Sequence, residues 1–419
     1  MRRPLLIVFL IIMIISLLYT NNKILDGSYN DEKVEITGIV EYKKEKEKYD
    51  EYKISKILVR DYTKSRNIKV GDKIIISGKF KSLGKMNNFE FDYGRYLKSI
   101  GCEGLIYIQS YKIIGESKFY KGLGKLKEYI RNSNRYLYKK NSDFINSLVL
   151  GEKDELSENE KDMFSRTGTS HIIAISGLHT GILCVLISFI IGGVNKFYKL
   201  VILITIMFIY CIMIGSSPSI LRAIFFIIVL YIAVFTDRKR DGISTLSLIG
   251  IILLVNNPYI LYNISFQLSF LATLSIIYFY GYLNNKLKIS VISLTLASNI
   301  LTLPIIYYNF NGIPIISVIS NIIIVPFIGI IIYVSILSVV LFNINITISK
   351  YIAYFNCIII NAIYFLLCNL SDLDFAYVEI ENPSKVYVII YYTVVFSYMI
   401  YKELKVMKEQ TNELQGYYK

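Results

Sequence analysis

The sequence predicts a polytopic α-helical membrane protein of about ten spans, with a small extracellular β-barrel domain after the first span. Three observations predict this fold class. Hydrophobic residues make up 54% of the 419 residues, and the mean hydropathy of +0.47 is far above that of soluble chains. Apolar runs follow one another from residue 171 to residue 401. A polar stretch with the two-residue alternation of strands separates them from a first apolar run.

The positive charge is concentrated in the polar stretch. The formal net charge is +14, and residues 21–140 hold 27 Lys and Arg against 16 Asp and Glu. This excess fits either attraction to anionic lipid head groups or binding of a polyanion, and charge alone does not choose between them. Only one of the five cysteines, Cys102, lies outside the apolar runs, and no C-x-x-C pattern occurs. We therefore expect no disulfide framework, no metal site and no cofactor.

Residues 1–20 are predicted to form an N-terminal membrane anchor. Residues 4–19 are apolar and uncharged, and no A-x-A cleavage site follows them, which is typical of an uncleaved anchor. Arg2 and Arg3 precede the run. The positive-inside rule then places the N-terminus in the cytoplasm and the following residues outside.

Residues 21–117 are predicted to form the extracellular domain. Apolar and polar residues alternate over 34–40 and 74–80, and residues 52–60 and 105–111 make two further strands. A short helix over residues 91–99, ended by Gly101, lies between the third and fourth strands. This order is compatible with a barrel of the oligonucleotide/oligosaccharide-binding (OB) type, and periodicity alone equally permits other small β domains.

Residues 118–170 are predicted to form two polar helices. Over residues 118–140 apolar residues recur at helical spacing among many lysines and arginines. This pattern indicates a basic amphipathic helix, which either lies on the membrane surface or packs on the barrel. Ser157 and Glu160 form a capping box that opens a short acidic helix, and Gly168 ends it.

Residues 171–401 are predicted to form the transmembrane channel domain, followed by a basic cytoplasmic tail at 402–419. With basic residues in alternate turns, both termini are cytoplasmic. The segment 315–342 carries Pro326 and is either one broken helix or a re-entrant pair. We predict spans after the anchor at residues 172–194, 200–214, 220–236, 243–255, 259–282, 289–308, 315–342, 351–370 and 385–401.

Residues 167–182 hold both histidines, His171 and His179. Gly177 and Gly181 lie one helical turn apart, a spacing that lets another membrane helix approach closely. On one helix the two histidines would be about 12 Å apart along the axis, too far to share a metal ion. Ser176 and His179 share a helix face, but the flanking sequence is not G-x-S-x-G, so we favour packing with an interhelical hydrogen bond over catalysis.

Further polar residues inside the apolar region are candidates for a transport path. Arg222 follows a polar turn and either reaches outward to lipid head groups or lines an aqueous path. Taken singly, such groups more often join helices, whereas together they favour a path beside helices broken by proline. The channel candidates are Ser176, Gly177, His179, Gly181, Ser217, Arg222, Gln267, Ser269, Asn299 and Asn321.

Several stretches resemble the ComEC family, the membrane channels that internalise single-stranded DNA in natural transformation. The resemblance rests on residues 150–181, on residues 215–223, on Asn257 with Pro258, and on residues 266–272, in the family's order. It implies an OB-like domain outside and a channel in the cell membrane. Longer members carry a metallo-β-lactamase-like domain with a histidine-rich zinc motif. Two histidines cannot build that motif, so we expect a form without this domain and without enzyme activity.

The resemblance implies single-stranded DNA as the substrate and membrane lipids as partners. A DNA receptor, a cytoplasmic motor or a separate nuclease are further partners of such a channel, and the oligomeric state is not implied. Other function classes are a small-solute or ion transporter of the same architecture and a membrane hydrolase that uses Ser176 and His179. The expected DNA-binding residues lie in the basic domain, where lysines neutralise phosphates and aromatic rings stack bases: Lys73, Lys79, Lys81, Lys85 and Tyr93.

Overall fold

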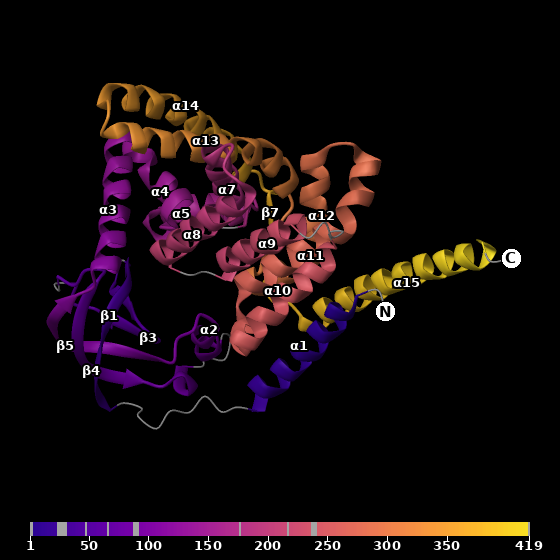
Figure 1. Cartoon of the computed structure of the whole chain (residues 1–419), viewed down its shortest axis with the longest axis horizontal. Coiled ribbons are helices and arrows are strands. Elements are labelled where there is room, and N and C mark those ends of the chain that lie inside the picture. The colour runs from indigo at the N-terminus through magenta and orange to yellow at the C-terminus, as the bar shows by residue number, and fades with distance from the viewer. Residues whose placement is uncertain are drawn as a thin grey trace.

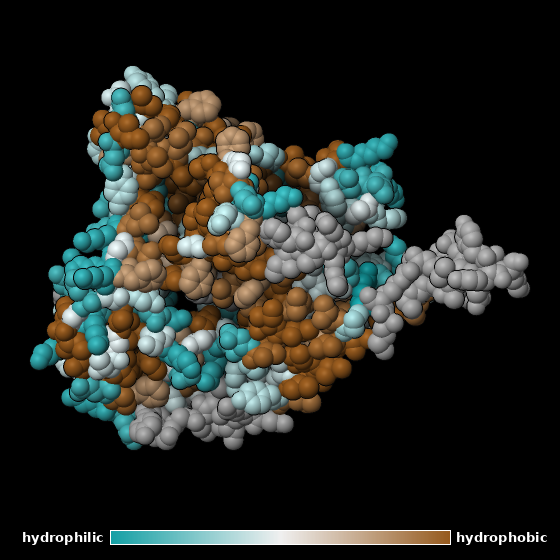
Figure 2. Space-filling model, viewed as in Figure 1, coloured by the Kyte–Doolittle hydropathy of each residue, from teal (hydrophilic) through white to brown (hydrophobic). Residues whose placement is uncertain are grey.

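The structure is a computed structural model, and it describes residues 3–22, 32–46, 48–64, 67–86, 92–175, 177–215, 218–235 and 241–417. A β-barrel with a short helix lies at one end of the molecule, and a long helix, α3 (Lys118–Tyr138), runs from it to the helical part (Figure 1). Hydrophilic residues gather over the barrel, whereas hydrophobic residues cover much of the helical part (Figure 2). The described chain therefore fits a membrane protein with one polar β domain.

The barrel is closed and has the strand order β1-β2-β3-β5-β4. Its neighbouring strands are antiparallel except β3 and β5, which run parallel. Residues that alternate along the strands fill its interior, as the two-residue period predicts. The strands are β1 (Lys33–Glu45), β2 (Asp50–Ile54), β3 (Ile57–Asp61), β4 (Asp72–Lys81) and β5 (Gly104–Glu116).

The prediction of one strand over residues 52–60 was wrong. The segment is a hairpin of β2 and β3, in which Tyr52 pairs with Val59. Ser55 in the turn has a φ of 51°, as tight hairpin turns require. The turn holds no Gly, Asn or Asp, so the usual hairpin signal is absent from the sequence.

The predicted helix before the last strand is confirmed as α2 (Tyr93–Ser99). Asp92 caps it, since its carboxylate accepts a hydrogen bond from the backbone N–H of Arg95 at 2.9 Å. Leu97 is buried against Leu58 of the barrel, together with η1 (Leu83–Met86) and Cys102. Burial raises the pKa of the Cys102 thiol to about 11, so this cysteine is a packed apolar residue rather than a reactive one.

Helix α3 begins on the barrel and ends among other helices. A Cβ on Gly71 would lie 2.5 Å from the backbone nitrogen of Lys121, so the first turn of α3 abuts the loop before β4. At its other end, the Tyr138 hydroxyl lies 2.8 Å from that of Ser338. Most of the apolar face of α3 thus packs on other helices rather than on the barrel. The elements that follow α3 along the chain are η2 (Lys139–Asn141), α4 (Ser142–Leu150), η3 (Lys153–Glu155) and α5 (Glu158–Arg166). The predicted capping box of α5 is confirmed.

The apolar region forms helices close to the predicted spans. Among the described residues, α1, α8, α11, α12, α13 and α14 are long and apolar enough to cross a membrane, and α7 and α10 are shorter apolar helices. Beside them lie η4 (Pro258–Tyr262) and a small sheet of β6 (Gly312–Pro314) and β7 (Tyr377–Glu379). The helices are α1 (Pro4–Asn22), α6 (Ser170–Ile173), α7 (Gly177–Ile191), α8 (Lys196–Ile214), α9 (Pro218–Phe235), α10 (Gly242–Asn256), α11 (Ile264–Leu287), α12 (Ser290–Phe310), α13 (Ser317–Phe342), α14 (Ile346–Ser371) and α15 (Lys385–Tyr417).

Helix α13 is one continuous helix that contains Pro326, so the structure shows no re-entrant pair within 315–342. The packing of α14, a candidate span by its length and composition, bears on its predicted crossing. Helix α14 contacts residues 136–166, which were predicted to lie outside, along its whole length. These contacts join Lys350 to Tyr136, Asn356 to Tyr138, Asn361 to Asn141, Tyr364 to Glu160, and Ser371 to Arg166. A helix that crossed to the cytoplasm would meet these residues at its outer end alone.

Candidate nucleic-acid interface

A row of charged and aromatic residues crosses the outer face of the barrel. The strand register places Glu51 of β2 opposite Arg60 of β3, Arg60 opposite Tyr107 of β5, and Tyr107 opposite Lys79 of β4. The preceding or following residues on these strands point inward, among them Tyr52 and Val59. The row therefore faces away from the core.

Tyrosine rings extend this row on one side. The guanidinium of Arg60 lies 4.7 Å from the ring centroid of Tyr49. The ring of Tyr62 lies 5.1 Å from that of Tyr49 and 6.0 Å from that of Tyr107. Tyr62 keeps 54% of its surface exposed. Exposed rings beside a guanidinium are the surface on which the bases of a single strand stack without sequence preference.

The predicted DNA-binding residues do not all lie together in the structure. Lys79 joins the row through its pairing with Tyr107, and Lys73, exposed at the other end of β4, lies about 20 Å away along the strand. Lys81 is half-buried on the same strand face. Tyr93 is half-buried and turned toward Arg60, which donates a hydrogen bond to its hydroxyl, so it positions the guanidinium. The side chain of Lys85 lies outside the described residues.

A charged junction connects the barrel to the helical part. A groove of about 410 Å³ separates β1 and the loop before β4 from α3 and η3. At its edge, Glu152 is buried between the ammonium of Lys127 at 3.1 Å and the Nε of Arg131 at 2.8 Å. Burial raises the pKa of Glu152, but the hydrogen bond from Arg131 and the charge of Lys127 outweigh it and hold the pKa below its ordinary value.

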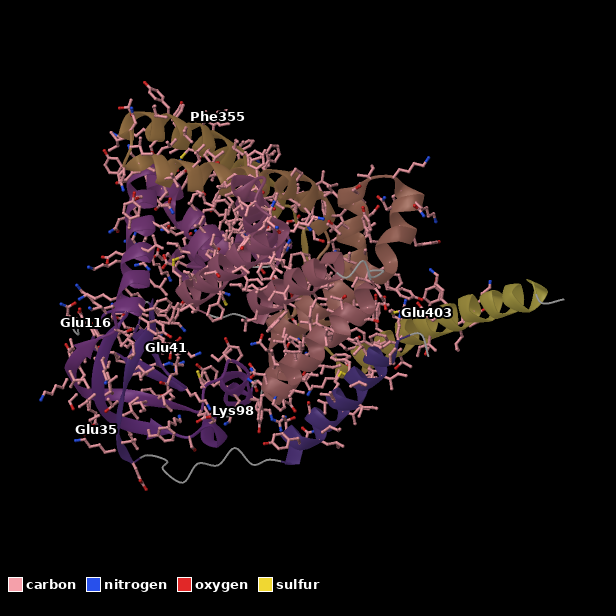
Figure 3. All side chains as sticks on the ribbon, in the orientation of Figure 1. Glu35, Glu41, Lys98, Glu116, Phe355 and Glu403 are labelled. Atoms are coloured by element: carbon pink, nitrogen blue, oxygen red, sulfur yellow. The ribbon has the colours of Figure 1, made fainter. Side chains whose placement is uncertain are left out.

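Two contacts fix the barrel against the ends of membrane helices. The ring of Tyr42 in β1 covers Gly215 at the end of α8, where a Cβ would lie 3.1 Å from the ring. On the other side, Asn257 donates a hydrogen bond to the carbonyl of Lys98 in α2 at 2.8 Å, and Asn263 donates one to the Ser99 hydroxyl at 3.2 Å. Lys98 marks this junction in Figure 3. Sequence reasoning quoted Asn257 for the resemblance alone and missed its docking role.

The stretch that holds the histidines is not one helix. Helix α6 ends at Ile173 and α7 begins at Gly177, so the prediction of a continuous helix from residue 172 was wrong. The separation of about 12 Å between the two histidines was derived for one continuous helix and therefore does not apply. His179 is buried, bonds the backbone at Ile172 and lies near enough to His171 to interact electrostatically. Ser176 lies outside the described residues.

The close helix approach occurs at another glycine than predicted. A Cβ on Gly181 would meet nothing within 4 Å, so the close packing expected there is absent. Gly168 instead has a φ of +69°, and a Cβ on it would lie 2.6 Å from the Cβ of Ser317. Glycine is needed there both for the left-handed backbone and for the contact with the start of α13.

The remaining channel candidates are dispersed. Gln267 caps η4 by donating to the carbonyl of Leu261 at 2.6 Å, and Asn299 donates to the Ser317 hydroxyl at 3.4 Å. Asn321 is buried in α13, and Ser269 is half-buried in α11. Gly177 is the first residue of α7. Ser217 and the side chain of Arg222 lie outside the described residues. The described candidates thus lie on four helices, and Asn299 and Asn321 are linked through Ser317, which precedes Asn321 by one helical turn.

A family model described as Competence protein matches residues 148–405, more than half of the chain. The chain belongs to the competence protein family. ComE operon protein 3 of Bacillus subtilis (strain 168) is 28% identical over 304 residues, which are 71% of this chain and 39% of that protein. An uncharacterized protein of Aquifex aeolicus (strain VF5) is 27% identical over 133 residues, which are 31% of this chain and 32% of that protein. No solved structure matches.

This competence protein thus spans about two fifths of the length of its Bacillus subtilis relative. The resemblance to the ComEC family is confirmed by the two comparisons. The matched region begins in α4 and includes η3 and all helices from α5 to α14. The barrel precedes it, so the basic outer face must be interpreted from its own residues.

Proposed function

We propose that this competence protein takes up single-stranded DNA in natural transformation, with the barrel as the DNA-gathering domain and the helical part as the channel. The observation that carries the proposal is the row of Arg60, Tyr107 and Lys79 with the exposed ring of Tyr62. It combines phosphate-binding charge with base-stacking rings on one barrel face. A closed five-stranded barrel is also compatible with the OB type, whose face binds oligonucleotides.

Two sets of contacts support the proposed sidedness, with the barrel outside and both termini in the cytoplasm. The barrel docks on Gly215 and Asn257, which lie in turns predicted to be outside, and on Asn263, near the predicted outer end of the span 259–282. At the other end of the molecule, Arg3 pairs with Asp241 at 3.5 Å and with Glu403 at 3.2 Å. All three were predicted to be cytoplasmic. Segments assigned to the same side by charge therefore meet in the structure, and the apolar helices between them face membrane lipids.

Helices α13 and α14 are an exception, and we propose that they form a hairpin whose tip stays on the barrel side. The partner of α14, residues 136–166, packs on it through apolar as well as polar side chains. It follows α3, which carries too many basic residues to be a span. The opposite face of α14 exposes aromatic rings, and Phe355 points away from the molecule (Figure 3). A hairpin removes two crossings together, so the cytoplasmic assignment of the C-terminal tail is unchanged.

The proposal is tested by DNA binding to the full chain in phosphatidylcholine nanodiscs, with a fluorescent oligothymidylate as probe. Tyr62→Ala should weaken binding about tenfold, because a stacked base is lost. Arg60→Gln should weaken binding and flatten its dependence on salt. Tyr387→Ala is the control, since Tyr387 is an exposed tyrosine of α15. Equal affinity of Tyr62→Ala and the control would remove the barrel face from the mechanism.

A further inference from the structure

A second basic cluster lies where the barrel faces the segment between α4 and α5. The ammonium of Lys44 in β1 lies 2.5 Å from the carboxylate of Asp154 in η3. The ammonium of Lys161 in α5 donates to the backbone carbonyl of the same aspartate at 3.5 Å. Lys153 lies within electrostatic range of Lys44 and Lys161. One carboxylate therefore lies among three lysines from two parts of the chain.

The cluster is accessible to a ligand. About a quarter to a third of each side chain is exposed at Lys44, Asp154 and Lys161 (26%, 29% and 32%), and Lys153 is exposed at the surface. Partial desolvation and then repulsion from Lys44 lower the pKa of Lys153 even so. An excess of like charge around one anion is a site that gains stability from a further anion.

The neighbouring acidic groups reduce this excess but do not cancel it, since the three lysines face the carboxylates of Asp154 and Glu158. Glu158 pairs with Lys161 at 2.8 Å. The carboxylate of Glu152 is occupied by Lys127 and Arg131 on the other side of η3. Among the described residues, Asp154 is thus the acidic side chain that pairs with Lys44.

The cluster continues into the aromatic row on the barrel. Lys46, two residues after Lys44, lies 5.2 Å from the ring centroid of Tyr49, and the guanidinium of Arg60 lies 4.7 Å from the same centroid. Lys46 and Arg60 share Glu51, at 3.6 and 3.4 Å. A line of charges therefore runs from Lys79 on β4 to Lys161 on α5, with aromatic rings along its barrel part. An anionic lipid head group would use the lysines alone, whereas a single strand uses both lysines and rings.

We propose that Lys44, Lys153 and Lys161 form a phosphate-binding site in which Asp154 holds the place of a DNA backbone phosphate until single-stranded DNA displaces it. This inference rests on the proposed function, since it assumes that the strand runs along the barrel face. The site passes the strand from the barrel to the membrane helices. It also explains why a lysine cluster contains a half-buried aspartate on the short η3 turn.

The test uses the full chain in phosphatidylcholine nanodiscs and the same oligothymidylate. Asp154→Asn should tighten binding roughly twofold to fivefold, because it removes a competing charge from a partly exposed pair. The double variant Lys44→Gln/Lys153→Gln should weaken binding and reduce the slope of log K against log salt by about 1.4, for two phosphates. Lys286→Gln/Lys288→Gln, at the other end of the molecule, is the control for loss of two charges.

The sign of the Asp154→Asn effect separates the outcomes, since a misfolded protein does not bind more tightly. Weaker or unchanged binding would show that Asp154 only ties η3 to the barrel, and would overturn the inference. If Arg60→Gln weakens binding while both cluster variants behave as the control, this site fails and the proposed function stands. If the unaltered protein binds no oligothymidylate at low salt, both fail. Tighter binding of Asp154→Asn to anionic vesicles but not to DNA would assign the site to lipid.

Discussion

The hydroxyl of Tyr364 in α14 donates a hydrogen bond to the carboxylate of Glu160 in α5, at 2.9 Å. Tyr364 lies in a segment long and apolar enough to cross a membrane, whereas Glu160 belongs to a charged helix on the barrel side. The contact joins the C-terminal half of α14 to a charged helix. It supports the proposal that α13 and α14 pack as a hairpin on the barrel side.

This packing predicts the side on which the hairpin tip is exposed. In a variant without native cysteines, Asn345→Cys should react with a membrane-impermeant maleimide added outside intact cells. Lys286→Cys, in a turn predicted to be cytoplasmic, is the matched control and should react after the cells are opened. Labelling of residue 345 only in opened cells would restore the crossing of α13 and α14.

The docking of α2 predicts that the asparagines around η4 hold the barrel in place. Asn257→Ala removes hydrogen bonds to the carbonyls of Lys98 and Ser99, at a cost of about 1–3 kcal/mol of docking free energy. We expect faster hydrogen exchange in α2 and unchanged exchange in the barrel strands. Asn309→Ala, whose side chain bonds only its own helix, is the control. Unchanged exchange in α2 would show that other contacts suffice.

The buried ion pairs of Glu152 predict a stability that depends on pH. Glu152→Gln should destabilise the protein by about 3 kcal/mol at neutral pH, because Lys127 and Arg131 lose their partner. The folded-state pKa of Glu152 lies below its ordinary value. Its contribution is therefore present above the ordinary carboxyl pKa and is lost as the pH falls through the folded-state value. Thermal unfolding midpoints of the two proteins should converge in acid, and a constant difference at all pH values would contradict this assignment.

Two glycines within residues 167–182 should respond differently to the same substitution. Gly168→Ala should destabilise the protein by more than about 1 kcal/mol, because a Cβ there collides with Ser317 on a left-handed backbone. Gly181→Ala should be neutral or stabilising, because a Cβ there meets open space within a helix. Unfolding midpoints in detergent measure both. Equal effects would mean that the α5–α13 contact does not form.

Local pattern predicted elements well where the signal lies within one segment. Alternation of apolar and polar residues predicted β1 and β4, and Ser157 with Glu160 predicted the start of α5. The hairpin turn at Ser55 was missed because its backbone conformation is imposed by the pairing of β2 and β3 rather than by a turn residue.

The candidate site was predictable in composition but not in geometry. Charge indicated the barrel domain as the candidate DNA-binding surface, and pairing partners on distant strands decided that Lys79, rather than Lys73, meets the tyrosine row. Hydropathy alone cannot decide whether α14 crosses the membrane, because an apolar helix face packs equally on lipid or on protein. The break before Gly177 was hidden because residues 172–194 are apolar on both sides of it.

The central claim is that this chain takes single-stranded DNA into the cell. The most direct measurement is uptake of labelled DNA into a nuclease-protected form, in cells whose gene for this protein has been deleted. The account predicts that uptake is lost on deletion, returns with the unaltered chain, and returns only weakly with the double variant Arg60→Gln/Tyr62→Ala. Protected DNA at the normal level in the deleted cells would contradict it.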